Sequence, residues 1–149
     1  MKKILLQAGH GGRRLGAIGA PGERDWNVET VKQLKEALSG KVEVTTIGGD
    51  DWKEAVKYDY DLFLAIHYDA DIYNDRGGFV DTPEPYLDYS SIKSKRIARI
   101  IREHYFSATG IPEKPERSNR NTREYYMWQH ISAKTPCVII ECGVGDRRP

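Results

Sequence analysis

Near its N-terminus the chain reads Ile4-Leu5-Leu6-Gln7-Ala8-Gly9-His10-Gly11-Gly12, and this stretch decides the class of fold. Its apolar half predicts a strand over residues 3–8. A histidine between glycines follows at the carboxyl end of that strand, where α/β folds place their ligands. The glycines permit a sharp turn and leave room beside the imidazole ring. The stretch therefore predicts a functional histidine, His10, at the rim of a sheet.

The rest of the chain alternates predicted strands and helices. Strands are expected over residues 42–47, 61–66, 78–81 and 137–141, with a weaker one over 125–128. Helices are expected over residues 25–38, over 52–57, and from Ser90 or Ser91 to Thr109. This alternation favours an α/β domain with a largely parallel sheet that is covered on both faces. The polar stretch 111–124, with two prolines, is expected to be a loop.

Length, charge and cysteine spacing exclude several classes of protein. At 149 residues the chain suffices for one domain with a buried core, and its net charge of +1 gives no basis for binding nucleic acid. No stretch is long enough to span a membrane. Cys137 and Cys142 have an odd spacing on one predicted strand, which places them on opposite faces. We therefore expect two small buried residues and neither a disulfide nor a redox pair.

The N-terminus gives no secretion signal. Met1-Lys2-Lys3 and the apolar residues after it imitate the start of one. The apolar run stops at Gln7, short of the roughly 7–15 residues that such a signal needs. Unless a signal has been removed, we expect a protein made in the cytoplasm without one.

Four reactive side chains fall at the ends of predicted elements. His10 and His67 end strands, Glu23 begins the first helix, and Glu141 ends the last strand. The carboxyl ends of parallel strands meet at one rim, so we expect these side chains to converge. Two histidines and one glutamate leave zinc a fourth position for water, as in catalytic zinc sites, and Glu141 is then free to act as general base. Asn27 lies one helical turn after Glu23 and faces the same side.

Each of these residues, taken alone, also has an ordinary explanation. A lone histidine is usually a satisfied core or surface group, Glu23 suits the positive end of a helix dipole, and Glu141 suits an ion pair. Their placement around one rim favours an active site. His104 lies on a helical stripe and His130 in a short polar segment, and we expect no function for either.

Four motifs resemble those of one known family along nearly the whole chain. They are Ala8-Gly9-His10-Gly11-Gly12, Glu23-Arg24-Asp25-Trp26-Asn27, Ile66-His67-Tyr68-Asp69-Ala70 and Pro136-Cys137-Val138-Ile139-Ile140-Glu141. Together they are similar to the zinc-dependent N-acetylmuramoyl-L-alanine amidases of bacteria and their phages. The resemblance implies a single α/β domain with a twisted, mostly parallel sheet flanked by helices on both faces. It also implies Zn²⁺ held by His10, Glu23 and His67, with Glu141 as the catalytic carboxylate.

The resemblance implies peptidoglycan as substrate, cleaved at the amide between the lactyl group of muramic acid and L-alanine. Zinc would polarise the lactyl carbonyl, and Glu141 would pass the proton of the attacking water to the departing amine. Arg120 and Arg123, with Arg117, are candidates to meet the anionic stem peptide, although a solvated surface loop explains them equally well. A chain that opens on the catalytic motif without a signal looks more like the catalytic domain of a phage lysin, acting on the wall, than like a secreted autolysin.

The chain departs from the family pattern at two places. Gln7 stands where the family commonly has an aspartate. The chain also ends soon after Glu141, so we expect it to lack the family's terminal helix and any wall-binding domain. Apolar surface near Val138, Ile140 and Val144 would then self-associate or be covered by an extension, and the oligomeric state is left open.

Two other functions fit the same residues. A different zinc hydrolase of the cell wall, such as a peptidase or a sugar deacetylase, could use the same rim. A non-catalytic module that binds the cell wall, with an inactive site, is the alternative from another functional class. The nature of the released product distinguishes the amidase from the other hydrolases.

Overall fold

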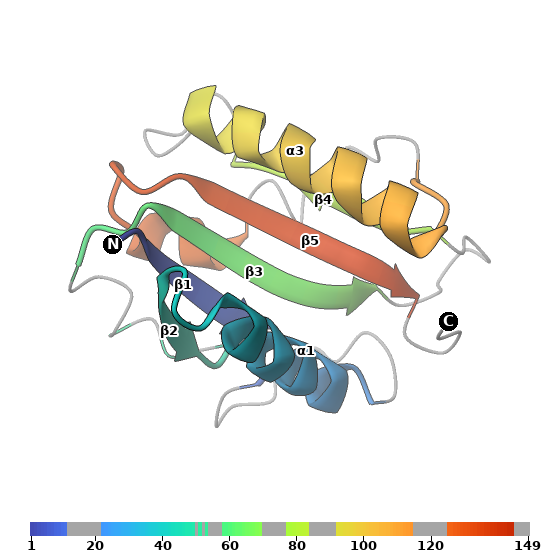
Figure 1. Cartoon of the computed structure of the whole chain (residues 1–149), viewed down its shortest axis with the longest axis horizontal. Helices are drawn as coiled ribbons and strands as arrows, with labels where there is room; N and C mark the ends of the chain where they lie inside the picture. Colours follow the sequence, from blue (N-terminus) through green and yellow to red (C-terminus); the bar gives the residue numbers. More distant parts are fainter. Residues whose placement is uncertain are drawn as a thin grey trace.

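Figure 1 shows the computed structural model of the chain. It describes residues 1–11, 22–49, 51, 53, 58–69, 77–83, 92–114 and 125–144, with backbone alone at residues 69 and 144. The elements in chain order are β1 (Lys3–Ala8), α1 (Glu23–Leu38), β2 (Glu43–Ile47), β3 (Leu62–Asp69), β4 (Phe79–Asp81), α3 (Ile92–Thr109), the 3₁₀ helix η1 (Tyr126–His130) and β5 (Cys137–Val144).

The five strands form one sheet in the order β2-β1-β3-β5-β4. The first four of these are parallel to one another, and only the short edge strand β4 runs antiparallel to its neighbour β5. The three central strands are apolar on both faces, as buried parallel strands are. The prediction of a single-domain, mostly parallel α/β sheet is confirmed.

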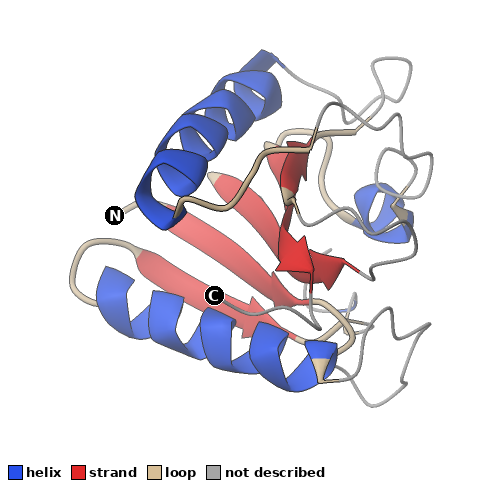
Figure 2. Cartoon of the chain, turned by 90° about the vertical axis from the view of Figure 1, so that its right-hand side faces the viewer, coloured by secondary structure: helices blue, strands red, loops and turns tan. Residues whose placement is uncertain are grey.

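The two faces of the sheet have different covers. Figure 2 shows α1 and α3 on one face and η1 on the other. Side chains alternate accordingly along β3, where Phe63 and Ala65 belong to the core under η1 and Ile66 to the core under the α-helices. Trp128 of η1 is fully buried and meets Phe63 edge to face, with ring centroids 5.9 Å apart. The expected helical cover on both faces is therefore present in the described part of the chain.

The sequence prediction was wrong for Tyr125–Trp128, which is not a strand. Residues Tyr126–His130 form the 3₁₀ helix η1, preceded by Tyr125. Met127 and Trp128 are both fully buried although they are adjacent, whereas Tyr126 is 43% exposed. A strand would send neighbouring side chains to opposite faces, and only a tight helical turn places both under the sheet.

Other element predictions were correct to within a few residues. Helix α1 begins two residues earlier than expected, and β5 runs on to Val144. The expected helix 52–57 and the N-cap at Ser90 or Ser91 fall outside the described residues, apart from Lys53. The loop 111–124 is described only to Lys114, where Glu113 forms an isolated parallel bridge with Gly78.

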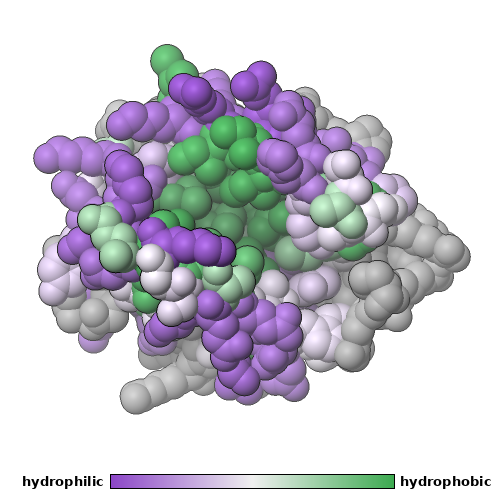
Figure 3. Space-filling model, viewed as in Figure 1, coloured by the Kyte–Doolittle hydropathy of each residue, from purple (hydrophilic) through white to green (hydrophobic). Residues whose placement is uncertain are grey.

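The predicted apolar surface near Val138 and Ile140 is not exposed. Val138 is 0% and Ile140 3% accessible, the latter packed with Ile101 and Tyr105 of α3. The Tyr105 hydroxyl also donates a 2.7 Å hydrogen bond to the Cys142 carbonyl, which ties α3 to β5. Figure 3 shows apolar surface gathered in the hollow between the two α-helices. The side chain of Val144 lies outside the described residues.

No helix in the described ranges combines the length and the hydrophobicity required to cross a lipid bilayer.

Candidate metal centre

Three side chains from three different elements converge at the carboxyl rim of the sheet. His10 follows β1, Glu23 is the first residue of α1, and His67 lies near the end of β3. Glu23 Oε1 lies 3.3 Å from His10 Nε2 and 3.6 Å from His67 Nδ1. The three donor atoms all lie within 4.8 Å of one another. The structure therefore brings together the three residues that the sequence predicted as metal ligands.

The donor set fits zinc by type, and the two distances from Glu23 also fit it by spacing. Zinc binds imidazole nitrogen and carboxylate oxygen at about 2.0–2.2 Å, so two tetrahedral ligands lie roughly 3.3–3.6 Å apart. The two distances from Glu23 Oε1 fall in that range. One carboxylate between two imidazoles is also the donor set of catalytic sites with three protein ligands and an open position.

The position of the His67 ring explains why a glycine, Gly9, precedes His10. A Cβ atom on Gly9 would lie 2.5–2.6 Å from three atoms of the His67 imidazole. The imidazole therefore rests against the backbone at Gly9, and any side chain there would displace it. Gly9 N–H donates to the Ile66 carbonyl at 2.9 Å, which fixes this close approach through the β1–β3 pair.

His10 itself has a strained backbone. Its φ of 56° lies in the left-handed region, which is unfavourable for residues with a Cβ and is common at functional sites. Gly49, just after β2, approaches it so closely that a Cβ on Gly49 would lie 2.8 Å from the His10 amide nitrogen. Gly49 was not predicted as part of the site, and its one local signal is the Gly48-Gly49 pair after the predicted strand.

Glu23 is buried, with 2% of its surface accessible. Burial alone would raise the pKa of its carboxyl group, but hydrogen bonds and charge interactions with His10 and His67 outweigh burial and lower the pKa to about 2. The position at the N-terminus of α1 also favours a carboxylate. Glu23 is therefore an anion at neutral pH, as a metal ligand must be.

Asn27 supports this carboxylate, as expected for a residue one turn along the same helix. Its Nδ2 donates to the Gly9 carbonyl at 2.9 Å and to Glu23 Oε1 at 3.4 Å. Asn27 is fully buried. It joins α1 to the turn after β1 and so holds two of the three ligand-bearing segments together.

His67 is 6% exposed, and burial lowers the pKa of its imidazole. The hydrogen bond and charge of Glu23 raise this pKa, and the nearby His10 lowers it, so that the net change is downward. A histidine with a lowered pKa is neutral at physiological pH, the form that binds metal. Its Nε2 lies 3.2 Å from the Tyr125 hydroxyl. Tyr125 was not predicted as a site residue, because it lies far along the chain in a segment that was expected to be a strand.

Glu141 lies beside His67 on the neighbouring strand. The two residues are register partners in the parallel pair of β3 and β5. The register shifts just beyond this pair, which marks a bulge between His67 and Asp69. Glu141 is 9% exposed, and its side chain points to the η1 face, as do Ile139 and Cys137 two and four residues earlier. The structure thus places the predicted catalytic carboxylate beside His67, one of the three candidate metal ligands.

The remaining candidates behave differently. Arg120 and Arg123, with Arg117, fall outside the described residues. His104 is exposed on α3 and His130 half-buried on η1, and neither belongs to the group that could hold a metal. Cys137 and Cys142 are free and lie in the two different cores, as expected.

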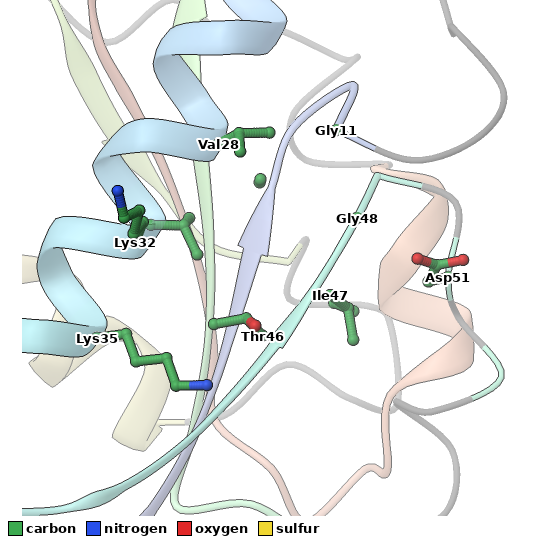
Figure 4. Close-up of a pocket in the computed structure, with 10 residues that line it drawn as sticks. Gly11, Val28, Lys32, Lys35, Thr46, Ile47, Gly48 and Asp51 are labelled. Carbon is green, nitrogen blue, oxygen red and sulfur yellow. The ribbon is translucent and has the colours of Figure 1, made fainter. Parts of the chain in front are cut away.

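A pocket of about 420 Å³ lies next to the metal centre, between α1 and β2. Ala8 and Gly11, on either side of the Gly9-His10 turn, form part of its wall, and Lys32, Lys35 and Thr46 form another part (Figure 4). None of the three metal-ligand candidates lines it. The pocket is therefore a neighbour of the site and not the metal-binding cavity.

Solved structures share this fold. The CwlD amidase from Clostridioides difficile, solved in complex with the GerS lipoprotein, superposes with a TM-score of 0.69 at 23% identity, over 97% of this chain and 83% of that chain. Ami1, an N-acetylmuramyl-L-alanine amidase from Mycobacterium smegmatis, gives 0.71 at 19% identity, over 96% and 82%. The catalytic domain of the CD27L endolysin, which targets C. difficile, gives 0.67 at 16%, over 98% and 83%. At these identities the likeness shows the fold alone.

The sequence itself identifies the family. No curated protein sequence matches the chain closely enough to add to the comparison. The sequence profile described as N-acetylmuramoyl-L-alanine amidase matches residues 4–148, from the first strand to the penultimate residue. This match includes the three convergent ligand candidates and Glu141. The chain belongs to the N-acetylmuramoyl-L-alanine amidase family.

Proposed function

We propose that the chain is a zinc-dependent hydrolase that cleaves the amide between N-acetylmuramic acid and L-alanine in peptidoglycan. Membership of the amidase family supports the substrate and the bond. The observation that carries the zinc dependence is the convergence of His10, Glu23 and His67 within 4.8 Å. These three residues would hold the ion.

A zinc ion bound there supplies a Lewis acid for the amide carbonyl and lowers the pKa of its water. Glu141 is the residue of this chain that moves the proton. It would accept the proton of the attacking water and return it to the alanine amine as the carbon–nitrogen bond breaks, because an amine leaves only when protonated. Its register position beside His67 supports this role.

The remaining residues of the centre hold the ligands in place. Asn27 fixes the Glu23 carboxylate and the turn at Gly9 at the same time. The buried surroundings of Glu23 and His67 strengthen electrostatic interactions at the reacting atoms. Ligand positions fixed before substrate binds need no reorganisation during the reaction.

Substrate contacts and biological setting follow as further parts of the proposal. Arg120 and Arg123 would bind the carboxylates of the stem peptide. A role as a lysin catalytic domain, made in the cytoplasm and acting on the wall, is the setting that we propose for the chain.

Product analysis tests the proposal. Purified peptidoglycan is digested with the zinc-loaded protein, and the soluble products are identified by mass spectrometry. An amidase releases stem peptides with a free N-terminal alanine and leaves the glycan chains intact. Released acetate identifies a deacetylase, shortened stem peptides identify a peptidase, and binding without any product identifies a wall-binding module. Any of these three outcomes would overturn the assignment.

A further inference from the structure

We propose that Tyr125 and Gln7 form a positioning relay that fixes the protonation pattern of His67 for metal binding. The proposal deepens the zinc-dependent function above and rests on it. The relay consists of three consecutive contacts, which join Gly49 to Gln7, Gln7 to Tyr125 and Tyr125 to His67. It assigns a role to Gln7, the residue that departs from the family pattern.

The first contact fixes the orientation of the Gln7 side chain. Gln7 is fully buried on β1, and its Nε2 donates a 2.9 Å hydrogen bond to the Gly49 carbonyl. The reversed amide would place its oxygen against that carbonyl oxygen, which is repulsive. Gln7 Oε1 is therefore the atom that faces Tyr125.

The second contact uses the only proton of the Tyr125 hydroxyl. This hydroxyl donates to Gln7 Oε1 at 2.8 Å. A phenol is protonated at neutral pH, so this hydroxyl has one proton to donate. With its proton used, the hydroxyl oxygen can only accept from His67.

The third contact then determines the tautomer of His67. His67 Nε2 lies 3.2 Å from the Tyr125 oxygen and must carry the hydrogen. Nδ1 is left with its lone pair, and it is the nitrogen on the Glu23 side, 3.6 Å from Oε1. A histidine that binds a metal through one nitrogen and donates from the other is the usual arrangement at such sites.

The surrounding packing makes this arrangement rigid. The Tyr125 ring meets the His67 ring edge to face at 5.4 Å and the buried Trp128 ring at the same distance. The Trp128 amide also donates to the Tyr125 carbonyl at 3.0 Å. The Gln7 amide is neutral, so the residue that accepts the Tyr125 proton carries no charge.

The relay is tested on zinc affinity, measured by competition between the zinc-loaded protein and a chromogenic chelator. Tyr125→Phe removes one oxygen and should raise the zinc Kd by about 10- to 100-fold. Gln7→Leu should weaken zinc binding although Gln7 does not touch His67, because the Tyr125 proton would then turn to His67 Nε2. The double variant should bind zinc no more weakly than Tyr125→Phe, since both changes break one relay.

Tyr105→Phe is the matched control. It also removes a hydroxyl with a 2.7 Å hydrogen bond, but at the contact between α3 and β5. It should leave zinc affinity unchanged while costing similar stability. Long-range ¹H–¹⁵N spectra of the zinc-loaded protein should show the His67 hydrogen on Nε2.

The outcomes separate the relay from the function. Wild-type zinc affinity in Tyr125→Phe, or a hydrogen on Nδ1 of His67, would overturn the relay while the amidase assignment stands. A wild-type protein that binds no zinc would overturn the proposed function as well as the relay.

Discussion

His67 and Glu141 are register partners on neighbouring parallel strands, so the proposed metal ligand and the proposed proton carrier stand side by side on one face of the sheet. The regular register of β3 and β5 up to this pair, just before the bulge, fixes this neighbour relation. The spacing between ligand and general base is thus set by the sheet and not by a loop, which is the more exact way to hold a catalytic pair.

Glu141→Gln should separate catalysis from metal binding. The amide keeps the shape of the carboxylate but accepts no proton, so zinc content should stay at the wild-type level while turnover falls by roughly 10²-fold or more. Zinc content and hydrolysis of purified peptidoglycan are measured on the same preparation. Glu103→Gln, on the exposed side of α3, is the control and should behave as wild type. Loss of zinc from Glu141→Gln would make Glu141 a ligand, and wild-type turnover would remove it from the mechanism.

Gly9→Ala should damage the metal centre although it adds a single methyl group. The new Cβ would lie 2.5 Å from the His67 ring, so the ring must leave the position that it holds beside Glu23. We expect weaker zinc binding together with a lower melting temperature. Gly40→Ala is the matched control, because its Cβ meets nothing within 4 Å and the change costs only backbone strain at a φ of 75°. Equal zinc affinity in both variants would show that the His67 position does not depend on Gly9.

The two cysteines should be chemically inert in the native protein. Burial raises the pKa of both Cys137 and Cys142 to about 12. At pH 8 the reactive thiolate is therefore a small minority, and the sulfur atoms are also shielded. Ellman's reagent should label neither residue under native conditions and both after denaturation. Rapid native labelling would mean that the cores around β5 open far more readily than their packing indicates.

Arg120 and Arg123 should matter for substrate and not for metal. If they bind carboxylates of the stem peptide, Arg120→Ala and Arg123→Ala should each raise KM with little change in kcat and none in zinc content. Arg99→Ala, on α3, serves as control for loss of one exposed cation. Unchanged KM in both loop variants would assign the loop to the solvated surface.

Much of the fold could be predicted, because the signals were local. The apolar runs of β1, β3 and β5 and the helical stripe of α1 each lie within one segment, and their order predicts a parallel sheet. The ligands followed from the rule that strand ends share a rim, which brings His10 and His67 together without knowledge of distances. The predicted elements and the predicted ligands therefore do not depend on knowing contacts between distant segments.

The features that could not be predicted depend on such contacts. Tyr125 joins the site only because η1 folds under the sheet, and its aromatic neighbours made the segment look like a strand. The Gly48-Gly49 pair marks a turn after β2 in the sequence, but the close approach of Gly49 to His10 is a contact that no spacing reveals. The burial of Val138 and Ile140 depended on how closely α3 packs on β5, and that is a property of the assembled fold.

Zinc stoichiometry of wild-type protein and of His67→Ala, measured side by side by elemental mass spectrometry after gel filtration, tests the central claim most directly. The geometry predicts about one zinc per chain in the wild type and almost none in His67→Ala, because two remaining ligands cannot retain the ion. His104→Ala, in which an exposed histidine of α3 is removed, should keep the full zinc content. One zinc per chain in His67→Ala would contradict the metal centre built by His10, Glu23 and His67.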